Sequence, residues 1–137
     1  MREIDSNKNI LLTRGDWLPL RLPLKNKDDG SDYILKEGDI VRFTIYKNKD
    51  VRDVIYQKDF NPVVGESYID IDIYSDETKI GDYINKTEEY CYQVELNPNT
   101  PYTITLLGVE RIGGRDVPKY FYLIPEAGEK NNGWTKI

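Results

Sequence analysis

The chain has 137 residues and a net charge of −5, with 19 basic against 24 acidic side chains. This length fits one domain with a single core, and the acidic balance argues against binding nucleic acid, because phosphate contacts need a basic surface. The sequence contains no histidine, and its one cysteine, Cys91, cannot form an internal disulfide.

The first part of the chain predicts a tail, a short strand and a long edge strand. Residues 1–8 are polar, without the apolar segment of a secretory signal, and we expect a flexible tail. Residues 10–13 predict a strand, and Arg14-Gly15-Asp16 a tight turn. Leucine then occupies every second position from 18 to 24, which leaves the opposite face to Trp17, Pro19, Arg21 and Pro23. Proline cannot donate to a strand ladder, so we expect this strand at an edge.

Apolar and polar residues alternate through most of the remaining chain, which is the period of a half-buried strand. One helical turn is expected at 75–78, and Gly113-Gly114 predicts a hairpin tip. No apolar run is long enough to cross a membrane. We therefore expect one all-β domain over residues 9–126, an antiparallel β-sandwich of the immunoglobulin-like or jelly-roll-like type, followed by a polar tail at 127–137. The other strands are expected at 40–47, 53–58, 68–74, 90–96, 102–109 and 117–124.

The sequence lacks the usual groups of an enzyme. Without histidine, no Ser-His-Asp or Cys-His arrangement is possible. Cys91 lies inside an alternating strand, where we expect a structural role. Asp70 and Asp72 share one strand face about 7 Å apart, a spacing that could suit calcium or a glycosidase, although a solvated strand face is the simpler interpretation. We expect a non-enzymatic protein with no cofactor and no metal.

Aromatic side chains are the better functional lead, since the chain has eleven tyrosines. Such residues with a polar rim form protein interfaces and also sugar-stacking platforms, so both a docking module and a carbohydrate-binding or adhesion module stay open. A second sheet that covers these faces is the structural alternative. The candidate interaction residues, all on predicted outward faces, are Trp17, Arg21, Tyr46, Tyr68 and Tyr74.

Several passages, taken in order, resemble small tail and baseplate proteins from phages and prophages of Gram-positive bacteria. The family they most resemble is the N-terminal domain of the phage upper baseplate protein. An Arg-Gly-Asp turn precedes the first long strand, and Gly38-Asp39 precedes the alternating strand that starts at Val41. A third passage combines Ile71, Ile73, Asp76-Glu77-Thr78, Gly81, Tyr90, Tyr92 and Leu96. This chain departs from the family pattern by an extra residue at Glu77, an insertion at 82–89 and an extension at 111–116.

The resemblance implies a structural protein of the virion, made in the bacterial cytoplasm. It implies that the partners are other tail or baseplate proteins and further copies of the chain, with no role for nucleic acid or membrane. The docking surfaces would be the strand edges near residues 10–24 and the N-terminal tail. The aromatic residues named above would act as anchors there.

Overall fold

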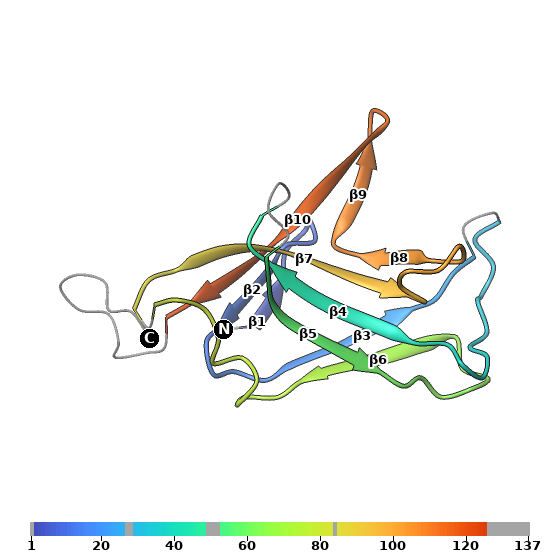
Figure 1. The fold of residues 1–137 in the computed structure, drawn as a ribbon, viewed down its shortest axis with the longest axis horizontal. Helices are drawn as coiled ribbons and strands as arrows, with labels where there is room; N and C mark the ends of the chain where they lie inside the picture. Colours follow the sequence, from blue (N-terminus) through green and yellow to red (C-terminus); the bar gives the residue numbers. More distant parts are fainter. Residues whose placement is uncertain (1, 27–28, 49–52, 84, 126–137) are drawn as a thin grey trace.

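The computed structural model describes residues 2–26, 29–48, 53–83 and 85–125 (Figure 1). In these ranges the chain is all β, and they include no helix of the length and apolar character that a membrane crossing requires. The strands of the described ranges are β1 (Arg2–Ile4), β2 (Ile10–Thr13), β3 (Leu18–Pro23), β4 (Val41–Tyr46), β5 (Val54–Phe60), β6 (Tyr68–Ile73), β7 (Glu88–Leu96), β8 (Ile104–Leu107), β9 (Val109–Ile112) and β10 (Arg115–Ile124).

The strands form one curled sheet and a separate two-stranded ribbon. The sheet order is β1-β2-β10-β7-β4-β5, with β8 paired to β7 and β9 paired to β10, while β3 and β6 make the ribbon. Strand pairs in the described ranges are antiparallel except β2 with β10, which is parallel. The expected purely antiparallel arrangement is therefore wrong at this pair. The two strands are separated by most of the chain, which is long enough for a parallel pair.

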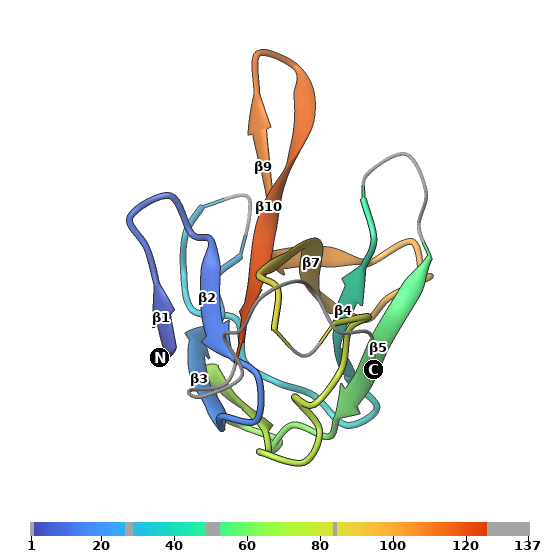
Figure 2. The ribbon, with the colours of Figure 1, turned by 90° about the vertical axis from the view of Figure 1, so that its left-hand side faces the viewer.

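The ribbon packs across the hollow of the curled sheet, beneath it in Figure 2. Its apolar face carries the alternating leucines of β3 and isoleucines of β6, and these share one core with side chains of the sheet. At the centre Phe43 stacks on Tyr92 with ring centroids 5.9 Å apart and meets Phe121 edge-on at 6.4 Å. The period-two pattern thus placed the inward residues of both layers correctly.

Most predicted strands are confirmed to within two residues at each end, and β2 spans Ile10–Thr13 as expected. The strand expected at 102–109 is instead divided into β8 and β9, because the chain turns at Gly108, which has a φ of 94°. Residues 1–8, expected as a tail, include β1, which pairs antiparallel with β2. The tail expected at 127–137 lies outside the described residues.

The turn expected at 75–78 is present as a hydrogen-bonded turn, with the Glu77 N–H bonded to the Tyr74 carbonyl at 2.9 Å, but it is not a helix. The Glu77 carboxylate accepts hydrogen bonds from the Tyr74 N–H at 2.9 Å, the Tyr56 hydroxyl at 3.1 Å and the Lys58 Nζ at 2.9 Å. Partial burial by itself raises the pKa of Glu77, but these donors outweigh it and the net pKa is lowered. The turn is thereby tied to β5, the edge strand of the curled sheet.

The buried Thr78 side chain ties the same turn to the other end of the sheet. Its hydroxyl donates to the Asp16 carbonyl at 2.7 Å and accepts from the Gly15 N–H at 3.0 Å. The tight turn expected at residues 14–16 is confirmed, with Gly15 at a φ of 89° and the Asp16 N–H bonded to the Thr13 carbonyl. One turn therefore connects the ribbon to both sides of the curled sheet.

Replacing Glu77 by glutamine tests this connection. We expect the free energy of unfolding to fall by about 1–2 kcal/mol at neutral pH, because donors that include a charged Lys58 lose their anionic acceptor. The folded pKa lies below the unfolded value of about 4.5, so this contribution is present above that pH and is lost as pH falls through the folded pKa. Urea denaturation across pH should show the two proteins converging in acid. An equal difference at every pH would contradict this.

Two glycines of the β8–β10 region test the turn between β8 and β9. A Cβ at Gly108 would lie 2.3 Å from the Tyr92 carbonyl oxygen and 2.7 Å from the Gln93 Cα. Gly114, at the hairpin tip, also has a positive φ, but a Cβ there meets nothing within 4 Å. We expect Gly108→Ala to cost about 3 kcal/mol or more in unfolding free energy and Gly114→Ala about 1 kcal/mol. Similar costs in thermal denaturation would show that the turn does not press against β7.

Candidate functional site

The outer surface of the β3–β6 ribbon gathers aromatic and charged side chains. In the ribbon register Arg21 faces Asp70 and Pro23 faces Tyr68, on the side opposite the leucines and isoleucines. Trp17 and Tyr74, immediately before β3 and after β6, extend this surface at one end of the ribbon. We call it the ribbon face, made of Trp17, Arg21, Tyr68, Asp70, Asp72 and Tyr74.

Arg21 holds the middle of the ribbon face in one geometry. Its Nε and Nη2 donate to the two Asp70 carboxylate oxygens at 2.7 and 2.9 Å, and its guanidinium lies 4.2 Å from the centre of the Tyr68 ring. The hydrogen bonds from Arg21 lower the pKa of Asp70. An exposed ion pair of this kind adds little to stability, so its main effect is to orient both side chains and the ring.

Trp17 is held from two sides and still presents an open surface. Its indole Nε1 donates to the Asp72 carboxylate at 3.2 Å. The Arg2 guanidinium, from β1, lies 5.3 Å from the ring centre and also donates to the Trp17 carbonyl at 3.4 Å. The side chain nevertheless remains 42% exposed. Its orientation is therefore set before any partner binds.

Tyr74 is placed in a similar way at the other strand of the ribbon. The Lys58 amine lies 4.9 Å from its ring centre and also donates to the Asp72 carbonyl at 3.1 Å. Tyr74 is 54% exposed. Together with Trp17, Ser75 and Asp76 it lines a shallow hollow, which we call the aromatic depression. An apolar side chain could enter it between two aromatic residues with a carboxylate at its rim.

Four of the five candidate interaction residues lie on the ribbon face: Trp17, Arg21, Tyr68 and Tyr74. Tyr46 does not, because it is only 4% exposed, and its predicted outward position is wrong. It lies on β4, between β5 and β7, and its register partner Cys91 is also buried. Thr44 and Gln93, on the same side of these strands, are covered too. The side of β4 and β7 that the sequence predicted to be exposed is therefore buried.

The sequence did not indicate the role of two basic residues, Arg2 and Lys58, whose side chains contact the rings of the ribbon face. Arg2 was assigned to a tail, and Lys58 was one polar residue of an alternating strand. Each reaches an aromatic ring only because β1 or β5 comes beside the ribbon in the folded chain. No local signal in the sequence marks either contact, since each joins segments far apart along the chain.

The two carboxylates singled out by the sequence, Asp70 and Asp72, both have partners on the ribbon face. Asp70 binds Arg21, and Asp72 accepts from Trp17, so neither has the free geometry of a catalytic acid pair. Within the described ranges, no group of three acidic or cysteine side chains is placed to hold a metal ion. In the acidic loop near residue 30, Asp29 caps Ser31 and Asp32 pairs with Lys25. The ribbon face presents aromatic rings and hydrogen-bonding groups.

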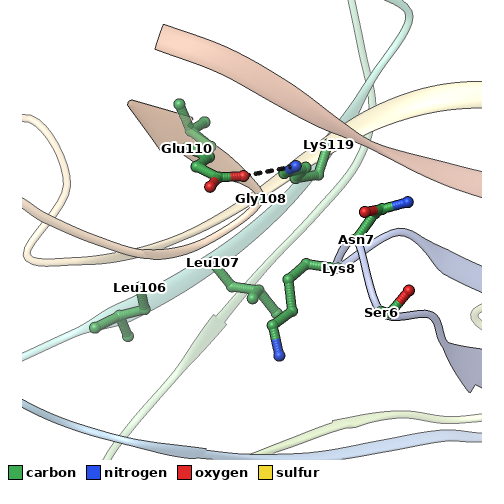
Figure 3. Close-up of a pocket in the computed structure, with 9 residues that line it drawn as sticks. Ser6, Asn7, Lys8, Leu106, Leu107, Gly108, Glu110 and Lys119 are labelled. Carbon is green, nitrogen blue, oxygen red and sulfur yellow. Dashed lines mark ion pairs between the residues drawn. The ribbon is translucent and has the colours of Figure 1, made fainter. Parts of the chain in front are cut away.

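Two other hollows are bounded by side chains that form ion pairs or hydrogen bonds with one another. The first lies where the turn after β1 meets the β8–β9 turn, and Figure 3 shows Lys119 paired with Glu110 at 2.8 Å along its wall. In the second the Asp39 carboxylate accepts from the Tyr33 hydroxyl and the Asn97 amide. These contacts stabilise local structure, so the ribbon face remains the stronger candidate.

The chain matches no family model, no curated protein and no solved structure. Function is therefore inferred from the chemistry of the ribbon face, together with the sequence passages described above. Both are properties of this chain alone, and both can be tested directly.

The positions of Tyr46 and Tyr74 predict opposite results for one kind of substitution. Tyr46→Ala leaves a cavity in the interior, and we expect the free energy of unfolding to fall by about 3–4 kcal/mol. Tyr74→Ala trims an exposed ring, and we expect a loss below about 1 kcal/mol. Urea denaturation followed by circular dichroism measures both. A larger loss for Tyr74→Ala would mean that its ring supports the fold rather than a binding surface.

Proposed function

We propose that this chain is a non-enzymatic structural component of a phage or prophage particle, located in the tail or baseplate. It acts as a docking module, in which the curled sheet and the ribbon form the two layers of a β-sandwich. The observation that carries the docking role is the ribbon face, where exposed Trp, Tyr and Arg side chains converge on one surface. These are the residue types that contribute most to binding at protein interfaces.

The ribbon face is suited to docking because its side chains are held in place before binding. Arg21 is fixed by Asp70, and Trp17 by Asp72 and Arg2. Ordering a mobile side chain costs free energy on association, so an interface ordered in advance binds with less loss. The same pairing occupies the carboxylates that an enzyme of this composition would need. A binding role therefore fits the surface better than a catalytic one.

The assignment to a virion rests on the sequence passages that resemble baseplate proteins. In the folded chain two of these passages meet, because Thr78 hydrogen-bonds to Gly15 and Asp16. The alternating passages lie on β4, β6 and β7, which are core strands. The residues that carry the resemblance thus work together in holding the fold.

A carbohydrate-binding or adhesion module is the second candidate, favoured by the aromatic depression. Sugar rings stack on aromatic side chains and hydrogen-bond to nearby carboxylates, and Trp17, Tyr74 and Asp76 offer both. Binding on a glycan array that is lost in Trp17→Ala would favour this function. A silent array alongside incorporation into particles would favour the first.

Particle composition tests the proposed function. Phage particles purified from the bacterium that carries this gene should contain the chain at a constant ratio to tail proteins, measured by quantitative mass spectrometry across a density gradient. We expect Arg21→Glu to lower incorporation at least about tenfold. Arg42→Glu is the matched control, because Arg42 makes the same two-pronged pair with Asp59 away from the ribbon. Absence of the chain from particles, or equal loss in both variants, would contradict the proposal.

A further inference from the structure

A hairpin arm projects from the body of the molecule. It comprises β9 and the first residues of β10, with the tip at Gly113-Gly114, and it extends beyond the curled sheet in both views (Figures 1 and 2). In the described part of the chain, β9 pairs only with β10. A two-stranded hairpin with no layer beneath it is marginally stable in water, so a protein surface that receives the arm would stabilise it. We call residues 109–118 the arm.

The tip of the arm presents an apolar side chain beside a cation. Ile112 is 52% exposed, and it lies directly opposite Arg115 in the hairpin register. Residues directly opposite one another project from the same face of a hairpin, so Ile112 and the exposed Arg115 share one face. Asp116 is opposite Arg111 and belongs to the other face. The first face therefore carries a positive charge next to an exposed aliphatic group.

The base of the arm is anchored, which sets the direction in which it points. Lys119 pairs with Glu110 at 2.8 Å across the two strands, as Figure 3 shows. The Lys119 N–H also donates to the Gly108 carbonyl at 2.7 Å, and Gly108 itself lies against the backbone of β7. These contacts at its base hold the arm in a fixed direction relative to the sheet.

The chemistry of the aromatic depression is complementary to that of Ile112 and Arg115 at the arm tip. Its exposed rings, Trp17 and Tyr74, can take an isoleucine side chain and can stack against a guanidinium group. Asp76, exposed at the rim, supplies the charge opposite to Arg115. The aromatic depression of a second copy of this chain therefore has both the rings and the carboxylate that the arm tip can bind.

The two surfaces lie on opposite sides of the molecule. The arm rises from the side of the curled sheet opposite the ribbon (Figures 1 and 2). The residues that line the depression come just before β3 and just after β6, at one end of the ribbon. The arm therefore cannot occupy the depression of its own chain. A contact between two different surfaces joins copies head to tail, which builds a ring or an open chain rather than a closed pair.

We propose that Ile112 and Arg115 at the arm tip of one copy dock in the aromatic depression of a second copy. The inference deepens the proposed docking function by naming the partner, and it rests on that use of the ribbon face. A standard stable interface buries about 800 Å² on each partner, and an arm tip offers less, so the association is weak. It should be visible at about 100 µM and above.

Sedimentation velocity over about 10–500 µM tests the contact, with the wild type expected to form species larger than a dimer. One variant blocks the arm (Ile112→Asp with Arg115→Glu), and another blocks the depression (Trp17→Ala with Asp76→Lys). Each keeps one intact surface, so each alone should be monomeric. An equimolar mixture should form a heterodimer and nothing larger. Arg42→Glu, away from both surfaces, should associate like the wild type, and unchanged circular dichroism confirms folding.

Three results would overturn the inference: a wild type that stays monomeric throughout, single-surface variants that associate like the wild type, or a mixture of the two variants that stays monomeric. Combining Arg115→Glu with Asp76→Lys in one chain reverses both charges, and it should recover association lost in Arg115→Glu alone. Monomeric wild type that still enters particles would refute self-docking and leave the virion role intact. Self-association of a chain that is absent from particles would refute the virion role and leave self-docking intact.

Discussion

The arrangement of the two layers depends on the hydrogen bonds of one turn, residues 74–78. The Glu77 carboxylate collects the Tyr56 hydroxyl and the Lys58 amine from β5, and the Thr78 hydroxyl bonds to both Gly15 and Asp16. These bonds hold the ribbon to both sides of the curled sheet and add to the apolar packing of the shared core. Packing is non-directional, whereas a carboxylate with three donors defines a position.

The same constraint sets the properties of the ribbon face. Lys58 binds Glu77 on one side and lies over Tyr74 on the other, so the element that closes the fold also orients an exposed ring. Trp17 follows directly after the turn that Thr78 holds, and Asp72 bonds to its indole. The exposed aromatic residues are thus attached to a turn held by several hydrogen bonds. A surface built this way can bind a partner without reorganising its side chains.

The arm and the aromatic depression represent two different ways of leaving apolar surface exposed. Trp17 and Tyr74 are rigid because cations and carboxylates from other strands surround them. Ile112 is exposed because β9 and the start of β10 extend past the sheet, anchored at Gly108 and Lys119. The arm is a local hairpin, whereas the aromatic rings are held by residues from other strands. Both also lie on surfaces where a protein would otherwise place polar residues.

The sequence by itself determined most of the strands and the inward leucines and isoleucines through its alternation, the edge position of one strand through its prolines, and the tight turn at residues 14–16 through Gly15. It could not determine which outward faces stay exposed, because Tyr46 and Tyr74 alternate in the same way although one is buried and the other open. Nor could it show that β2 runs parallel to β10 or that Arg2 reaches Trp17. The physical reason is that alternation reflects the local geometry of a single strand. Exposure and pairing are decided by which distant segments come to lie against it.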